Sequence, residues 1–225
     1  MKIKTNHLIT RMAVAAAVIF SISSCKKDDD NDNMLNAKLS FVNTVEGSAA
    51  QDIFINDSKV SASAVGYGSS SNDISTSAGN KTISFKNAGS ATVTASAEVN
   101  TSVNSSHTAF LVKQANGSMG ISLYANESNA VSGKAKVRFI NVAPMLTSTI
   151  NVTTSAGANL ISALAFKASS AYQAIDANTN LNVMMSGSLE VTTITGSELQ
   201  AGKIYTIWFD SSTATKVKYH IVVHN

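Results

Sequence analysis

Two histidines near the C-terminus have the spacing of a metal-binding pair. His220 and His224 form the motif His-Ile-Val-Val-His, which on a helix with a glutamate after the first histidine would bring both imidazoles to one zinc ion. That glutamate is missing, and the neighbouring residues alternate between apolar and polar, as in a strand. Four residues of a strand span about 13 Å, whereas two ligands of one zinc lie about 4 Å apart. We therefore expect no metal or other cofactor, and a solvated strand face carrying Lys216, Lys218, His220 and His224.

Carboxylates are the second candidates for chemistry. A glycosidase needs two of them on either side of the bond that it breaks. The acidic residues of the folded part are scattered singly, among them Glu46, Asp52, Asp57, Glu98, Asp176, Glu190 and Asp210. The chain also lacks a Gly-x-Ser-x-Gly motif and a glycine-rich phosphate loop. We predict that the protein is not an enzyme and has no catalytic residues, with a hydrolase as the least favoured alternative.

The only cysteine follows a segment with the form of a secretory signal. Lys2, Lys4 and Arg11 precede an apolar run at residues 12–22, and two serines then precede Cys25. A basic start, an apolar run of this length and small residues at its end are typical of a signal peptide. An exported chain with one cysteine has no internal disulfide, so packing alone must hold its domains.

The sequence Ile22-Ser23-Ser24-Cys25 resembles the lipobox of bacterial lipoproteins. The resemblance implies that residues 1–24 are removed and that the Cys25 thiol is acylated. Two or more fatty chains, such as palmitate, anchor a protein stably to a membrane without a transmembrane helix. The alternative is a plain signal peptide followed by a free thiol or an intermolecular disulfide.

The residues behind the cysteine are polar and acidic. Residues 25–36 show no hydrophobic periodicity, which favours a disordered tether. Lys26, Lys27, Asp28, Asp29 and Asp30 resemble the export signal that sends some Gram-negative lipoproteins to the outer face of the outer membrane. The resemblance implies a surface-exposed protein, with a periplasm-facing location as the alternative.

Removal of the signal changes the charge of the protein. The full chain has 17 Lys+Arg and 14 Asp+Glu, a net charge of +3. Three of the basic residues and none of the acidic ones lie in residues 1–24, so the processed chain would have 14 of each and a net charge of zero. Without a basic block or stripe, we expect no nucleic-acid partner.

The remainder of the chain has the pattern of an all-β protein. Short stretches alternate apolar and polar residues, with Gly, Asn and Ser between them, which predicts antiparallel strands. The clearest stretches are residues 37–43, 52–56, 81–85, 120–125, 136–141 and 216–225.

The chain also repeats itself. Residues 37–43 (AKLSFVN) match 135–141 (AKVRFIN), and residues 107–111 match 205–209, at one offset of 98. Residues 64–70 match 164–170 at nearly the same offset. We predict two tandem domains, 37–125 and 135–225, joined end to end by a short polar linker at 126–134. Each has the strand pattern of an immunoglobulin-like or transthyretin-like β-sandwich.

The repeated segments resemble a known bacterial family. The opening strand AKVRFINVAP, the segment DIFIND, the loop VGYGSSS and the strand start at Ala78-Gly79 are similar to domain of unknown function 4397, which often occurs in tandem in exported lipoproteins. The second copy has Phe166-Lys167 in place of Tyr67-Gly68 and Asn178 near the place of Gly79, so we expect that loop to differ. The family implies no established activity.

Three aromatic residues are candidates for either ligand binding or core packing. Tyr67, between two glycines, and its counterpart Phe166 form a candidate binding loop that could stack on a sugar or a partner. A structural plug at one end of each sandwich is the favoured interpretation. Trp208 occupies a strand position where the first copy has Phe110, which predicts a core residue.

These observations support a lipid-anchored envelope protein that binds a glycan or another envelope protein without catalysis. The alternative is a structural or adhesin-type subunit whose C-terminal strand, residues 216–225, pairs with the sheet edge of a neighbour.

Overall fold

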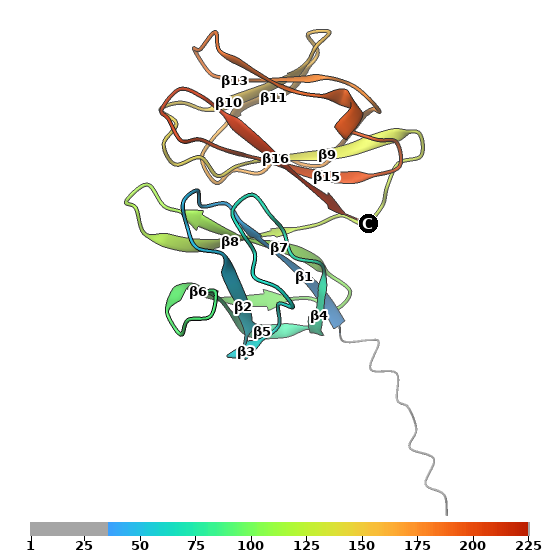
Figure 1. Cartoon of the computed structure of the whole chain (residues 1–225). Coiled ribbons are helices and arrows are strands. Elements are labelled where there is room, and N and C mark those ends of the chain that lie inside the picture. Colours follow the sequence, from blue (N-terminus) through green and yellow to red (C-terminus); the bar gives the residue numbers. More distant parts are fainter. Residues whose placement is uncertain (1–35, 225) are drawn as a thin grey trace, which may run out of the picture. The chain divides into compact units, whose positions relative to one another are not determined.

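A computed structural model describes residues 36–224 (Figure 1). The regular structure of these residues consists of strands and one short 3-10 helix, η2 (Gly196–Glu198). The strands before the linker are β1 (Asn36–Asn43), β2 (Gln51–Ile55), β3 (Ser58–Lys59), β4 (Ile74–Ser77), β5 (Gly79–Asn87), β6 (Val93–Thr101), β7 (Ser106–Lys113) and β8 (Met119–Ala125). Those after it are β9 (Lys134–Asn141), β10 (Ile150–Thr154), β11 (Asn159–Leu164), β12 (Gln173–Asp176), β13 (Leu181–Met185), β14 (Val191–Ile194), β15 (Ile204–Asp210) and β16 (Lys218–His224).

The first eight strands form one β-sandwich. One sheet has the order β4-β1-β7-β8 and the other β3-β2-β5-β6. Apolar residues at alternate positions point between the sheets, such as Leu39 and Phe41 on β1 and Ile83 and Phe85 on β5, all fully buried. Burial of each such side chain contributes about 1.5–3 kcal/mol, which lets a chain without internal disulfides hold together.

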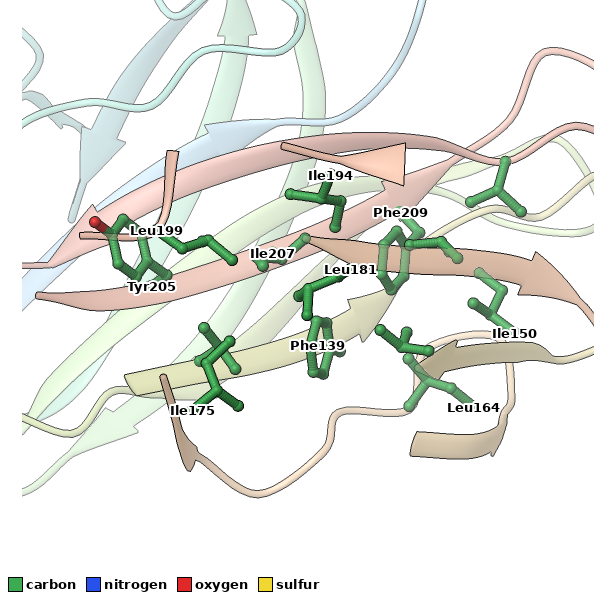
Figure 2. Packing of buried hydrophobic residues seen from close by; sticks show 14 of the residues in the cluster. Phe139, Ile150, Leu164, Ile175, Leu181, Ile194, Leu199, Tyr205, Ile207 and Phe209 are labelled. Atoms are coloured by element: carbon green, nitrogen blue, oxygen red, sulfur yellow. The ribbon is translucent and has the colours of Figure 1, made fainter. Parts of the chain in front are cut away.

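The last eight strands form a second sandwich in the same way. Its sheets have the orders β12-β9-β15-β16 and β11-β10-β13-β14. Phe139 and Phe209 stack at its centre, with ring centroids 6.0 Å apart, among Ile150, Leu181 and Ile207 (Figure 2). The predicted all-β fold of two sandwiches is confirmed.

One pair of strands in each sandwich is parallel, which differs from the antiparallel pairing that we expected. Leu39 of β1 pairs with His107 of β7, and Val137 of β9 pairs with Tyr205 of β15. Both partners are shifted by 98 residues between the copies, the offset of the sequence repeat. Alternation of apolar and polar residues indicates strands but not their direction.

The asparagine that ends the first strand of each copy has a structural role. Asn43 Nδ2 donates to the Val65 carbonyl (3.3 Å), and Asn43 Oδ1 accepts from the backbone N–H of Val45 (3.1 Å). Asn141 makes the same two bonds, to Leu164 and Ala143, at 3.0 Å each. In each copy, the asparagine therefore holds the start of the loop, at Val65 or Leu164, against the end of the first strand.

The loop that we expected to differ between the copies has the same backbone. Gly68 has φ +76° and Lys167 has φ +64°, and the N–H of each donates to the carbonyl of Asn43 or Asn141. Gly79 and Asn178 are likewise both left-handed, with φ of +102° and +61°. Asparagine tolerates this region and lysine adopts it at a cost, so the sequence changes while the conformation stays.

The two sandwiches contact each other through the outer faces of the β1–β7 and β9–β15 sheets, not end to end as predicted. The first contributes Val42, Phe110 and Val112, and the second contributes Ile140, Val142, Trp208 and Val222, all buried in one apolar cluster. We call this contact the junction. Tyr67, Tyr124 and Phe166 pack around it, half-buried.

Candidate functional site

Trp208 lies in the middle of the junction and is fully buried. Its indole stacks on the His220 imidazole, with centroids 3.9 Å apart, and meets the Phe110 ring edge to face at 6.4 Å. Trp208 is buried, as predicted for a core residue. It is buried, however, between the two sandwiches and not inside one of them.

A group of polar residues crosses one side of the junction. The Tyr67 hydroxyl donates to Asp210 Oδ2 (2.5 Å), and Lys218 Nζ donates to the Tyr67 hydroxyl (2.8 Å). Lys218 Nζ also lies 2.9 Å from Glu46 Oε2 and 3.6 Å from Asp210 Oδ2. We call Glu46, Tyr67, Asp210, Lys218 and His220 the junction cluster. Because Glu46 and Tyr67 belong to the first sandwich and the others to the second, the cluster ties the two together.

The other Asp210 oxygen faces the histidine. His220 Nε2 lies 3.4 Å from Oδ1, which is buried and accepts no well-aligned hydrogen bond from the described residues. The imidazole also meets the Tyr67 ring edge to face, with centroids 5.4 Å apart, so it is enclosed by tyrosine, tryptophan and aspartate.

These contacts shift the pKa values of the cluster. Burial alone would raise the pKa of Asp210, but the contacts with His220 and Tyr67 outweigh it, and the pKa lies below its ordinary value. Burial, and then the hydrogen bond to Asp210, raises the pKa of Tyr67 to about 12. Burial opposes the charge of Lys218, yet its bonds to Tyr67 and Glu46 raise its pKa above normal. At neutral pH the cluster holds an ionised Asp210, a charged Lys218 and a neutral Tyr67.

The C-terminal strand is therefore not the solvated basic face that its sequence indicated. Tyr219 and Ile221 pack against the core of the second sandwich, as expected. On the opposite face, however, Lys218 and His220 enter the junction cluster and Val222 joins the apolar junction. Alternation separates the two faces of a strand, but it does not show that a second domain covers one of them.

The candidate binding-loop residues both lie at the junction. Tyr67 reaches across to β16, and the opposite loop is held in return, because the Tyr124 hydroxyl of β8 donates to the Lys167 carbonyl (3.0 Å). Phe166 packs on the same apolar cluster. Each copy thus places this loop against the last strand of the other. Ligand contact by Tyr67 and Phe166 stays a prediction.

Arg138 fixes the start of the linker. Its guanidinium donates to the Ala125 carbonyl, to Asn126 Oδ1 (2.8 Å) and to Thr206 Oγ1 (2.8 Å), and it lies 4.6 Å from the centroid of the Tyr172 ring. The side chain is 3% exposed. The first copy has Ser40 at this position, so the clamp on the end of β8 exists on one side only.

A cavity of about 510 Å³ opens beside the linker, and we call it the junction groove. Thirteen of its fourteen lining residues are polar. They come from β1, β4 and β7, from the loops before β4 and β7, from the end of β8 and the linker, and from the second sandwich: Asn36, Lys38, Asp73, Ser75, Ser102, Asn104, Ser105, Ser106, His107, Ala125, Asn126, Glu127, Ser128 and His224. A smaller cavity of about 270 Å³ shares Asp73 and His224 and extends the groove along residues 70–72.

Two histidines of the groove have depressed pKa values. Burial, with the nearby charge of Arg138 adding to it, lowers the pKa of His224 to about 4, and its Nε2 lies 2.8 Å from Thr206 Oγ1. Burial and the charge of Lys81 lower the pKa of His107. His107 Nδ1 is buried and has no hydrogen-bond partner among the described residues. The two histidines of the C-terminal motif therefore lie in different places: His220 in the junction cluster and His224 in the groove.

Two of the scattered carboxylates converge. Glu46 and Asp210 both contact Lys218, beside a small cavity of about 200 Å³. A general acid needs a raised pKa at neutral pH, whereas that of Asp210 is lowered. The pair therefore has the character of an ion-pair network. Within residues 36–224, no group of three His, Cys, Asp or Glu side chains could hold a metal ion.

Sequence reasoning missed the groove residues, although the sequence held a signal for them. Lys81 has the same strand parity as Ile83 and Phe85, and His107 the same parity as Ala109 and Leu111. Both side chains must therefore turn inward. A lysine and a histidine that both point inward near strand ends indicate that this end of the sandwich interior is polar.

The predicted lipidation site and export signal, Cys25, Lys26, Lys27, Asp28, Asp29 and Asp30, lie outside the described residues. Within the described part of the chain, no helix has the length and apolarity needed to cross a membrane.

Comparison with known proteins gives a family and distant structural matches. The crystal structure of CBMbc, a family CBM26 module from Eubacterium rectale Amy13K in complex with maltoheptaose, is 10% identical, with a TM-score of 0.27, and the match covers 83% of this chain and 96% of that one. A likeness this low carries no argument about function. No curated protein matches the chain. The model of the family "Domain of unknown function (DUF4397)" matches residues 37–148, which include the whole first sandwich and strand β9. Through this segment, the chain belongs to the DUF4397 family.

Proposed function

We propose that the protein is a non-catalytic binding module of the cell envelope, and that the junction groove is its binding site for a hydroxyl-rich ligand, a glycan. The observation that carries the proposal is the lining of the groove, in which serine, asparagine and charged side chains of the first sandwich and the linker, together with His224 of the second sandwich, surround about 510 Å³. Sugar hydroxyls both donate and accept hydrogen bonds, and these side chains offer both roles. A site of this volume is within the range of small-ligand pockets.

The junction supports this proposal because it fixes the walls of the groove. The apolar cluster, the junction cluster and the Arg138 clamp all connect the first sandwich to the second. A site whose walls are already in place loses less conformational entropy when a ligand binds. The groove is therefore suited to selective binding by hydrogen bonds.

The proposed location brings the groove close to envelope glycans. We propose that acylated Cys25 anchors the chain to the outer membrane with the sandwiches facing the exterior. Asn36 lines the groove, and ten residues, 26–35, separate it from Cys25. At about 3.5 Å per residue, this segment reaches at most about 35–40 Å, so the groove would meet ligands near the membrane surface.

A blocking substitution tests the site. Ser75 is exposed on β4 and lines the groove, whereas Ser77, two residues further on the same face of β4, is exposed and does not line it. The full chain in detergent, screened against an array of bacterial oligosaccharides, should bind a glycan. Ser75→Trp should abolish that binding and Ser77→Trp should leave it intact. Equal binding by both variants would place the site elsewhere, and capture of an envelope protein instead of a glycan would exclude the glycan proposal.

Assembly through strand edges is the second candidate function. Strand β16 is at the edge of its sheet, and Val223 on it is 49% exposed. An uncovered edge can pair with a strand of a neighbouring chain. Val223→Lys adds a charge to this edge while Tyr219 and Ile221 keep the core intact. If the edge mediates assembly, sedimentation of the unaltered chain should show oligomers that this variant lacks.

A further inference from the structure

Two buried cations lie behind the junction groove without a carboxylate partner. Lys81 is 4% exposed, and its Nζ donates to the Gly79 carbonyl and to Thr101 Oγ1, both at 2.8 Å. Arg138 is 3% exposed, and it donates only to carbonyl, amide and hydroxyl oxygens. Neither cation forms an ion pair within residues 36–224. A buried charge without a counter-charge is costly.

Each buried cation bonds to a residue that lines the groove or adjoins a lining residue, although Lys81 itself lines a separate cavity. Thr101, the acceptor of Lys81, precedes the lining residue Ser102, and the charge of Lys81 acts on the lining residue His107. Arg138 bonds to Ala125 and Asn126, which line the groove, and its charge acts on His224. The two cations therefore project positive potential into the groove from two of its walls.

The charges that line the groove do not cancel this potential. Lys38 is exposed on the groove wall and forms no ion pair with the described residues. Glu127 forms an ion pair with Lys136, and its charge also acts on Arg138 from a distance. Asp73 is the remaining lining carboxylate. Lys38, Lys81 and Arg138 thus face a single unpaired carboxylate, and the groove has an excess of positive charge although the processed chain would be neutral overall.

We propose that the ligand of the junction groove carries an anionic group, a carboxylate or a phosphate, that supplies the counter-charge missing from Lys38, Lys81 and Arg138. This inference rests on the proposed function and narrows it from glycans in general to acidic ones. Serine and asparagine side chains then bind the hydroxyl groups that surround the anion.

Binding of three matched probes tests the proposal. The full chain in detergent is titrated by calorimetry with a trigalacturonate, a phosphorylated trisaccharide and a neutral maltotriose. We expect at least one acidic probe to bind more tightly than the neutral one, and its affinity to fall as salt rises, because added ions screen the groove charges. The two acidic probes distinguish a carboxylate from a phosphate as the recognised group.

Substitution of the exposed lysine locates the effect. Lys38→Gln should weaken the preferred acidic probe by about fivefold to tenfold, the loss expected for one charge-assisted contact. Lys113→Gln is the matched control, because Lys113 is exposed at the far end of β7, lies outside the groove and loses the same charge. Lys81→Met, which also removes a charge but keeps most of the unbranched side chain, should weaken binding of the acidic probe while circular dichroism shows a folded protein.

The outcomes separate this inference from the proposed function. If maltotriose binds as tightly as the acidic probes and Ser75→Trp blocks it, the groove binds glycans and the anionic preference is wrong. Equal weakening by Lys38→Gln and Lys113→Gln would also overturn the inference, because the attraction would then be one of general charge. Absence of binding by both acidic probes would overturn it outright.

Discussion

The phenol of Tyr67 in the first sandwich donates a hydrogen bond of 2.5 Å to the carboxylate of Asp210 in the second. Removal of this hydroxyl by Tyr67→Phe leaves Asp210, which is 4% exposed, with one fewer donor. A buried carboxylate that loses a donor destabilises the folded state by about 1–3 kcal/mol. Chemical denaturation should show a loss of this size.

Tyr124→Phe is the matched control for this change. Its hydroxyl donates to the neutral carbonyl of Lys167 at an exposed position, so its loss should cost less than that of Tyr67. If the two variants lose equal stability, the junction cluster contributes no more than an ordinary surface hydrogen bond.

The buried histidine of the groove predicts a pH dependence. The pKa of His224 is about 4 in the folded protein and about 6.5 in an unfolded chain. The unfolded state therefore binds more protons between these values, and this contribution to stability is present above pH 6.5 and lost as the pH falls toward 4. Its size is on the order of 2 kcal/mol. His224→Gln keeps a hydrogen-bonding side chain without the titration.

Unfolding free energies at pH 7 and pH 4.5 check this prediction. The loss between the two values should be smaller in His224→Gln than in the unaltered chain. His107, whose pKa is also lowered, should account for part of the loss that remains. An identical loss in both proteins would mean that His224 is solvated in the folded state.

The fold could be predicted because its signals are local. Leu39 and Phe41, or Ile83 and Phe85, mark the inner faces of strands by alternation alone, and the offset of 98 residues identified the two copies before any coordinates. The direction of the β1–β7 pair could not be predicted, since parallel pairing depends on the connections between strands and not on their composition.

The junction was predictable only in part. Residues 204–210 (IYTIWFD) are buried on both faces, and an apolar run of this kind indicates a strand covered on both sides. Lys218 and His220 did not indicate the junction, because charged residues on one face of a strand predict exposure to solvent unless a partner for the charge is known. Asp210 and Glu46, which supply that partner, lie on other loops and strands. The groove also forms only when the two sandwiches pack together, so it could not be predicted from the sequence.

Left-handed backbone at the junction loop predicts opposite effects in the two copies. A Cβ at residue 68 would need φ +76° and would lie 3.1 Å from His220 Nδ1, so Gly68→Ala should destabilise the protein by about 1–2 kcal/mol. At the equivalent position, Lys167 already bears the left-handed strain at φ +64°. Lys167→Gly should relieve it and raise stability by up to about 1 kcal/mol. Thermal denaturation of both variants tests the pair. If Lys167→Gly instead loses stability, the contacts of the lysine side chain outweigh its backbone strain.

Removal of the thiol tests the proposed anchor. Cys25→Ala should leave the chain unprocessed or release it to the soluble fraction, because no acyl chain can be attached. Metabolic labelling with palmitate and fractionation of membranes measure both effects. Full membrane retention of a cleaved Cys25→Ala chain would contradict the lipoprotein proposal.

The acidic run behind the cysteine tests the proposed surface address. Asp28, Asp29 and Asp30 replaced together by Ala remove three negative charges from the tether and leave the described sandwiches unchanged in sequence. If these residues direct export to the outer face, the variant should stay lipid-anchored but lose accessibility to protease on intact cells, while remaining sensitive after the cells are opened. Asp73→Ala serves as a control, because it removes a carboxylate from the folded part. Unchanged accessibility of the triple variant would place the export information elsewhere in the chain and leave the acidic run as a spacer.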